Sequence, residues 1–118
     1  MENNSLMLVF DVYIDGMHKG TQEFKEEAIA LGSGDVALSF PDADLKPLHA
    51  VFNISDSKVS LVDLGAGGIK KNGETVNSNT EVHTGDVIEI GRLRLELKII
   101  DLGFSEEEIT DVNKASNA

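Results

Sequence analysis

Apolar and polar residues alternate along several short stretches of this chain. Because successive side chains of a β-strand point to opposite faces of the sheet, such alternation predicts strands that bury one face. The alternating apolar positions are Leu8, Phe10, Val12 and Ile14 in the first stretch, Ala50, Phe52 and Ile54 in a middle one, and Leu93, Leu95, Leu97 and Ile99 in the last. Charged residues fill the gaps of the last stretch, so a shift of its register by one residue would bury charges.

Turn-forming residues separate these stretches. Many short strands with such interruptions and little helix indicate an all-β protein, and specifically an antiparallel β-sandwich. A helix over residues 22–30 is the competing interpretation of one segment. Strands are favoured there because Gly32-Ser33-Gly34 ends the segment and its neighbours are predicted strands. The interruptions are Asp15-Gly16, Pro41 to Pro47, Ser55 to Lys58 and Gly91-Arg92.

A glycine-rich stretch, residues 64–73, lies between two of the predicted strands. Gly65, Gly67 and Gly68 allow positive φ angles and a close approach by another chain. Asn72-Gly73 is a strong signal for a hairpin turn. A loop of this composition either binds a partner or simply connects two strands, and the residues alone leave both interpretations open.

The C-terminal residues have a different pattern. Ser105 and Glu108 have the spacing of a capping box, which predicts a helix of one or two turns, and residues 111–118 are mostly polar. We therefore expect one sandwich domain over residues 1–100 and an acidic tail over residues 101–118. The tail is either a short helix with a mobile end or a linker to a further segment.

Composition limits the function classes. A chain of 118 residues that is 41% hydrophobic suits one domain, and the absence of cysteine excludes disulfides, thiol catalysis and cysteine-ligated zinc. A net charge of −11 opposes binding to nucleic acid or to anionic membrane surfaces. The longest apolar run, residues 6–10, is too short for a signal peptide or a membrane span. We expect a cytoplasmic segment without direct membrane contact.

No motif for catalysis or metal binding is evident. The three histidines, His18, His49 and His83, lie at separate turns, and the sequence has no nucleophile elbow, P-loop or EF-hand spacing. His49 and Asp63 would form a triad with a serine only if the fold brought the three together. A non-catalytic protein with neither cofactor nor metal is therefore expected, since function has to be argued from a site.

Six short motifs, in order along the chain, resemble those of the forkhead-associated (FHA) domain. They are Leu31-Gly32, Asp35 to Leu38, His49-Ala50, Val62 to Leu64, Asn72 to Glu74 and Gly85 to Gly91. The resemblance extends from about Leu6 to Ile100. It implies an FHA/SMAD-like β-sandwich whose loops at one end bind peptides that contain phosphothreonine. It also implies structural roles for His49, Asn72 and Gly73.

The chain departs from the family at the residues that bind the phosphopeptide. The family has an arginine where this chain has Ser33, a serine where it has Lys46, and an asparagine where it has Gly67. An arginine fork forms two aligned hydrogen bonds with phosphate, and charge-assisted hydrogen bonds are each worth roughly 1.5–3 kcal/mol. The resemblance therefore implies a degenerate site that has lost conventional phosphothreonine affinity.

These observations favour a non-catalytic protein–protein interaction module within a larger scaffold or regulatory protein. The predicted partner-binding residues are Ser33, Lys46, Gly65, Ala66, Gly67, Gly68, Lys70 and Lys71. One alternative retains phosphopeptide binding, with Lys46, Lys70 and Lys71 acting as point charges toward an acidic or phosphorylated partner. Another is a cytoplasmic domain of a bacterial secretion or motility assembly, because such assemblies contain FHA-like domains with eroded sites.

Overall fold

The computed structural model describes residues 6–76 and 78–102. Within these ranges it consists of strands and turns without a helix, so no helix there is long and apolar enough to cross a membrane. The helix predicted at Ser105 to Glu108 lies outside the described residues, as does the rest of the predicted tail beyond residue 102. The strands are β1 Leu6–Ile14, β2 Met17–Phe24, β3 Ala28–Gly32, β4 Leu38–Ser39, β5 Ala50–Ser55, β6 Lys58–Asp63, β7 Ile69–Lys71, β8 Glu74–Thr75, β9 Asn79–Val82, β10 Val87–Ile90 and β11 Leu93–Asp101.

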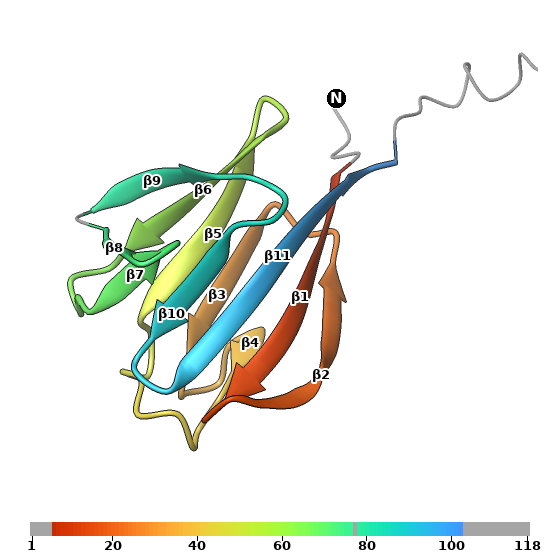
Figure 1. Cartoon of the computed structure of the whole chain (residues 1–118). Coiled ribbons are helices and arrows are strands. Elements are labelled where there is room, and N and C mark those ends of the chain that lie inside the picture. The colour runs from red at the N-terminus through yellow and green to blue at the C-terminus, as the bar shows by residue number, and fades with distance from the viewer. Residues whose placement is uncertain (1–5, 77, 103–118) are drawn as a thin grey trace, which may run out of the picture.

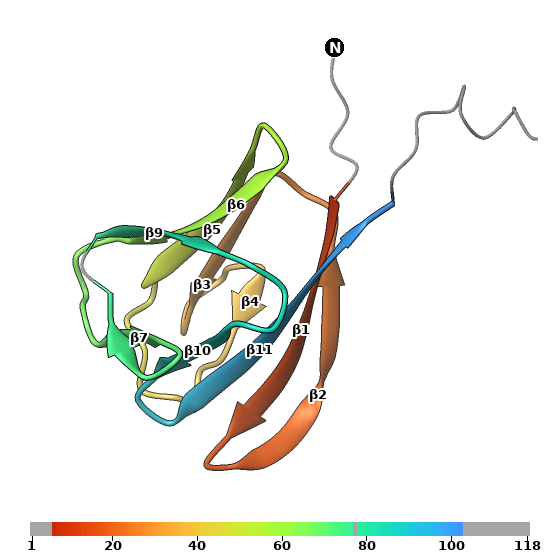
Figure 2. The ribbon, with the colours of Figure 1, turned by 45° about the horizontal axis from the view of Figure 1, so that its top comes forward.

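The strands form two sheets that pack face to face (Figures 1 and 2). One sheet has the order β2-β1-β11-β10-β7-β8 and the other β4-β3-β5-β6-β9. Among the described strands every neighbouring pair is antiparallel except β3 and β4, which pair in parallel over two residues. The all-β sandwich expected from the alternating pattern is confirmed, with this short parallel exception.

The core lies between the sheets and is built from the alternating apolar residues. Phe10 of β1 and Phe52 of β5 are fully buried, and their ring centroids lie 4.9 Å apart across the two sheets. Leu95 is also fully buried and pairs with Val12. The expectation that Ile99 is buried in the same way is wrong: Ile99 is only half-buried, because it lies at the rim of the core beside an open cavity.

Residues 22–30 form strands rather than a helix. Phe24 ends β2, Ala28 begins β3, and Ile29 and Leu31 are fully buried. The ring of Phe24 packs edge-on against that of Phe10, at 6.0 Å between centroids. The strand interpretation of this segment is therefore confirmed, since period-two burial of Ile29 and Leu31 does not fit a helical face.

The outer face of the six-stranded sheet carries one continuous row of polar and aromatic residues. Strand pairing sets Tyr13 opposite both His18 and Arg94, and sets Glu89 opposite both Arg94 and Lys70. The guanidinium carbon of Arg94 lies 4.2 Å from the centroid of the Tyr13 ring, a cation–π contact. Arg94 therefore packs on this face, whereas Lys98, further along β11, is exposed to solvent.

The register of β11 predicts opposite effects for two truncations on its two faces. Leu95→Ala should lower the free energy of unfolding by roughly 2–5 kcal/mol, because it leaves a cavity in a fully buried site. Lys98→Ala, on the exposed face, should change it by less than about 0.5 kcal/mol. Chemical denaturation of both variants measures the contrast, and equal losses would show that this register is wrong.

Candidate functional site

Three loops lie together at the end of the sandwich opposite the start of β1 and the end of β11 (Figure 1). They are residues 33–37 between β3 and β4, residues 40–49 between β4 and β5, and residues 64–68 between β6 and β7. We call this surface the loop face. It contains all the predicted partner-binding residues except Lys70 and Lys71, which lie on β7.

The first two loops dock against each other through their backbones. The N–H of Ser33 donates to the carbonyl oxygen of Lys46 at 2.9 Å, and the N–H of Gly34 donates to that of Pro47 at 3.1 Å. At Gly32 the chains approach so closely that a Cβ would lie 2.7 Å from the carbonyl carbon of Pro47. Glycine is required at this position because any side chain would push the two loops apart.

His49 joins the second loop to the third. Its Nδ1 accepts a hydrogen bond from the N–H of Lys46 at 3.2 Å, so its Nε2 carries the proton and donates to the carbonyl oxygen of Gly67 at 2.9 Å. Its backbone N–H donates to Leu31, and its carbonyl oxygen accepts from the N–H of Leu64. The residue is 5% exposed, so these bonds satisfy a buried polar group and fix the loops at the same time.

The glycine-rich loop is organised by Asp63, at the end of β6. One carboxylate oxygen of Asp63 accepts hydrogen bonds from the N–H groups of Gly65 at 3.0 Å and Gly67 at 3.2 Å. Positive φ angles at Gly65, Gly67 and Gly68 turn the backbone around this carboxylate. The arrangement resembles an anion-binding nest, but its anion is the protein's own carboxylate.

Ser33 and Lys46 contribute little phosphate-binding chemistry. The Ser33 hydroxyl donates to the carbonyl oxygen of Leu45 at 2.9 Å, so its hydrogen is not available to a ligand. The Lys46 side chain is exposed, and its ammonium is a point charge rather than a planar fork. The loop face thus presents no aligned pair of side-chain donors at these two positions.

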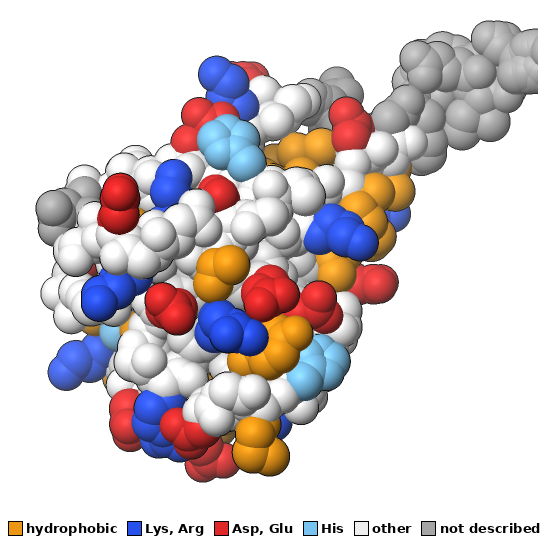
Figure 3. All heavy atoms as spheres, in the orientation of Figure 1, with side chains coloured by type: hydrophobic (Ala, Val, Ile, Leu, Met, Phe, Trp, Pro, Cys, Tyr) orange, Lys and Arg blue, Asp and Glu red, His pale blue; other side chains and the backbone are white. Residues whose placement is uncertain are grey.

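Lys70 and Lys71 project from opposite faces of β7. Lys70 lies opposite Glu89 on the outer face of the six-stranded sheet, whereas Lys71 shares the side of the buried Ile69 and donates from Nζ to the carbonyl oxygen of Glu81 at 3.0 Å. No described contact brings either lysine to Lys46. Figure 3 likewise shows basic and acidic side chains interspersed on the visible face, without one basic patch.

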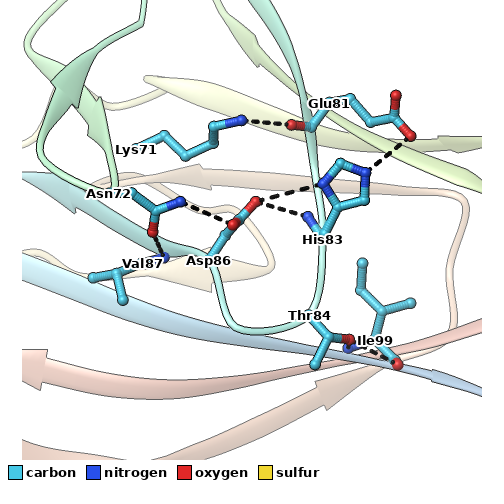
Figure 4. A network of polar contacts seen from close by, with 8 residues as sticks. All are labelled: Lys71, Asn72, Glu81, His83, Thr84, Asp86, Val87 and Ile99. Carbon is cyan, nitrogen blue, oxygen red and sulfur yellow. Dashed lines mark hydrogen bonds and ion pairs between the residues drawn. The ribbon is translucent and has the colours of Figure 1, made fainter.

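Asn72 and Gly73 form the β7–β8 turn, and Asn72 ties this turn to β10 (Figure 4). Both residues have positive φ, as a tight Asn-Gly turn requires. The Asn72 side chain donates to Asp86 at 2.9 Å and accepts from the N–H of Val87 at 2.8 Å. Asp86 also accepts from the N–H of His83 at 2.8 Å, so one carboxylate holds two turns together.

Burial of Asp86 acts to raise its pKa, but other effects outweigh it. Hydrogen bonds from Asn72 and from the His83 backbone, together with the nearby charges of Lys71 and His83, hold the pKa of this carboxyl below its ordinary value of 3.8. The charged form of Asp86 is therefore favoured in the folded protein.

The loop face also contains two residues that the sequence did not single out. Leu48 and Leu64 are 50% and 44% exposed, unlike the apolar residues of the core. Leu48 precedes His49 in the chain, and the N–H of Leu64 donates to the carbonyl oxygen of His49 at 3.2 Å. No sequence signal separates an exposed leucine from a buried one where alternation ends, so only the structure reveals that these two are exposed.

The loops carry more negative than positive charge. Residues 33–49 and 63–68 contain four aspartates and one lysine, Lys46, which gives them a local net charge of −3. The aspartates are Asp35, Asp42, Asp44 and Asp63. Arg92 adds one positive charge at the β10–β11 turn, but its guanidinium is already bonded to Asp15 at 3.0 Å and to Asp44 at 3.1 Å. The local field therefore has the same sign as that of the whole chain.

Within the described residues, His49 and Asp63 do not form a triad with a serine, and no cluster of metal-binding side chains is present. Both nitrogens of the His49 ring bond to backbone groups, and Asp63 bonds to backbone amides, so neither is directed at a serine. No group of three or more histidine, aspartate or glutamate side chains in these ranges is placed to hold a metal. A cavity of about 230 Å³ lies between His83, Lys58 and Ile99, but none of the predicted partner-binding residues lines it.

Comparison with known proteins identifies the same architecture. A family model described as the FHA domain matches residues 29–91. The FHA domain of the CT664 protein from Chlamydia trachomatis is 18% identical, with a TM-score of 0.69 over 78% of this chain and 96% of that one. No curated protein matches the chain in sequence.

Two further solved structures are similar. The FhaA FHA domain, complexed with the intracellular domain of Rv3910, is 25% identical, with a TM-score of 0.64 over 80% of this chain and all of that one. The cytoplasmic domain of PscD, a type III secretion sorting platform protein from P. aeruginosa, is 18% identical, with a TM-score of 0.63 over 83% of this chain and 82% of that one.

The environment of Asp86 predicts a specific response to acid. Because its pKa is lower in the folded than in the unfolded chain, its contribution to stability is present above about pH 4 and is lost as the pH falls through the folded value. Asp86→Asn should therefore unfold at a lower temperature than the wild type at pH 7, with a difference that shrinks below pH 4. Thermal unfolding between pH 2 and pH 7 measures this.

Asp42→Asn serves as the control for this measurement, because Asp42 is exposed and has no hydrogen bond within the described residues. If the difference between wild type and Asp86→Asn stays constant across the pH range, the charge of Asp86 does not stabilise the turns.

Proposed function

This chain belongs to the FHA domain family, whose members are protein–protein interaction modules, and from this premise we propose that it binds a partner segment at its loop face without reading a phosphate. The function is non-catalytic, without cofactor or metal. The partner is a protein or peptide, and the domain works as part of a larger scaffold or regulatory protein.

The chemistry of the loop face carries this proposal. Ser33 stands where the family has its phosphate-binding arginine, and its hydroxyl hydrogen is used by Leu45. Gly67, which stands where the family has its asparagine, has no side chain, and its N–H donates to Asp63. A phosphate would gain one exposed lysine on loops whose residues 33–49 and 63–68 carry a formal charge of −3, so the net electrostatic interaction is unfavourable or weak.

Phosphopeptide binding through Lys46, Lys70 and Lys71 is less well supported. Lys70 and Lys71 project to opposite sides of β7, so the two ammonium groups do not converge on one ligand. Lys46 alone supplies a flexible point charge, and exposed pairs of this kind contribute about 0–1 kcal/mol. A partner that is acidic or phosphorylated therefore remains the alternative that the binding experiment has to exclude.

Similarity to PscD favours one cellular setting for the proposed module. PscD is a sorting platform protein of a secretion system, and its cytoplasmic domain has the same fold. A cytoplasmic domain of a bacterial secretion or motility assembly is therefore the setting that we propose for this chain.

Isothermal titration with a matched pair of peptide pools tests the proposal. One pool contains phosphothreonine in degenerate flanking sequence, and the other is the same pool after phosphatase treatment. Neither a single lysine nor a backbone amide should confer phosphate-dependent binding tighter than about 1 mM. Binding of the two pools should therefore be indistinguishable.

The control for this titration is Lys46→Ala, which removes the one lysine of the loop face. Micromolar binding that requires the phosphate and disappears in Lys46→Ala would refute the proposal and establish phosphopeptide recognition in its place.

A further inference from the structure

The β7–β8 turn consists of an asparagine followed by a glycine. Asn72 is the only asparagine of the chain that precedes a glycine, and both turn residues are exposed to solvent. Asparagine is thermally labile, because the backbone nitrogen of the next residue can attack its side-chain carbonyl carbon. Glycine hinders this attack least, since it has no Cβ. A Cβ added at Gly73 would meet no atom within 4 Å, so no neighbouring element packs against this side of the turn.

The folded domain restrains the Asn72 side chain through Asp86 and β10. Its Nδ2 donates to Oδ1 of Asp86 at 2.9 Å, and its Oδ1 accepts from the N–H of Val87 at 2.8 Å. Figure 4 shows the side chain directed at these two residues. Attack by the Gly73 nitrogen requires the side chain to turn back along its own backbone. The two side-chain hydrogen bonds oppose that rotation, because it would break them.

The two other asparagines of the described residues lack this combination. Asn53 lies on β5 before Ile54, and Asn79 begins β9 before Thr80. Both asparagines belong to a strand ladder, and both are followed by a β-branched residue, which hinders attack by the next backbone nitrogen. They therefore serve as internal references for the reactivity of Asn72.

The reaction needs water as its only other reactant. The Gly73 nitrogen attacks Cγ of Asn72, and the new N–Cγ bond closes a five-membered succinimide ring. The Cγ–Nδ2 bond breaks, and the amide proton of Gly73 leaves with the released ammonia. Water then opens the ring. Cleavage of the N–Cγ bond gives aspartate, whereas cleavage between the Gly73 nitrogen and the backbone carbonyl carbon of Asn72 gives isoaspartate. Both products have gained one water and lost one ammonia.

Either product opposes the contact that Asn72 makes with Asp86. A carboxylate replaces the Nδ2–H donor, and it faces the charged carboxylate of Asp86, which also accepts from the N–H of His83 at 2.8 Å. Two carboxylates at hydrogen-bond distance repel each other. Isoaspartate also adds one carbon to the backbone of a two-residue turn, which disturbs the register in which Lys71 pairs with Glu74.

We propose that Asn72 is a site of spontaneous deamidation, that its hydrogen bonds to Asp86 and Val87 slow the reaction in the folded domain, and that the product releases the β7–β8 turn from β10. The change is irreversible, because the ammonia is lost to solvent, so the turn alters with the age of the molecule. The inference does not depend on the proposed function of the loop face.

Peptide mapping by mass spectrometry tests the inference, at timed intervals during incubation of the full chain in mildly alkaline buffer. The samples are the folded wild type, the wild type unfolded in urea and folded Asp86→Ala. Conversion at Asn72 should be at least about tenfold faster in urea and at least about threefold faster in Asp86→Ala, because each lost hydrogen bond frees the side chain. Asn53 and Asn79 should stay unmodified in the folded samples.

Ile29→Val is the control for stability, because it weakens the core at β3 without contact to the turn. Its conversion rate at Asn72 should equal that of the wild type well below the unfolding temperature. This comparison separates local release of the side chain from unfolding of the whole domain. Circular dichroism confirms that each variant is folded during the incubation.

An exchange of amide and carboxylate tests the consequence of the reaction. Asn72→Asp copies one product and should lower the unfolding temperature at neutral pH. Adding Asp86→Asn to this variant places the amide at position 86, where its nitrogen can donate to position 72 while its oxygen accepts from the His83 N–H. The double variant should therefore unfold at a higher temperature than Asn72→Asp alone.

The contrary results are specific. Equal conversion at Asn72 in the folded wild type and in Asp86→Ala would overturn the inference, because the bond to Asp86 would then not restrain the reaction. Absence of conversion in both samples would overturn it as well. An Asn72→Asp variant that unfolds at the wild-type temperature, or that Asp86→Asn does not rescue, would overturn the proposed release of the turn.

Discussion

The arrangement of the loop face depends on one buried histidine. The two ring nitrogens and two backbone groups of His49 hold four partners: the Lys46 amide, the Gly67 carbonyl, the Leu31 carbonyl and the Leu64 amide. They lie on β3, on the β4–β5 loop and, for Leu64 and Gly67, on the β6–β7 loop, so the imidazole and its backbone fix the positions of segments that are distant in the sequence. Without it, a partly buried N–H and a partly buried C=O would lose their partners, and the cost for a fully buried group, about 1–3 kcal/mol, is an upper bound for each.

Because His49 holds the loops through backbone groups, the arrangement of the loops does not depend on the side chains that would contact a ligand. His49 bonds only to backbone groups, and Gly32 is required by a backbone approach, so the loops keep their arrangement whatever side chains they carry. The fold therefore does not depend on the side chains that these loops present to a ligand. In this chain the Ser33 hydroxyl donates to the carbonyl oxygen of Leu45, and the glycine loop encloses the carboxylate of Asp63.

The sequence predicted the strands that alternate over at least three apolar positions, because burial of one face leaves a period-two pattern. It predicted the Asn72-Gly73 turn because positive φ restricts the choice of residue. The parallel pairing of β3 with the two-residue β4 leaves no such pattern. The half-burial of Ile99 was also missed, since alternation shows which face a residue occupies and not where the opposing sheet ends.

The candidate site was harder to predict for a related reason. Resemblance to the family predicted which loops form the site and which of the family's side chains are replaced. The hydrogen-bond partners of Ser33, Asp63 and Lys71 depend on tertiary contacts, so no local sequence pattern predicted these partners. The exposure of Leu48 and Leu64 depends in the same way on where neighbouring loops end.

Hydrogen exchange of individual amides tests the central role of His49 most directly. The Lys46 amide donates to the His49 ring, and the Gly67 amide belongs to the loop that the ring anchors. In His49→Ala both amides should exchange at least about tenfold faster than in the wild type, while the amides of β6 exchange at the wild-type rate. In the control variant His83→Ala, the Lys46 and Gly67 amides should exchange at the wild-type rate. Equal exchange of Lys46 and Gly67 in wild type and His49→Ala would contradict the account, because the loops would then hold their positions without the histidine.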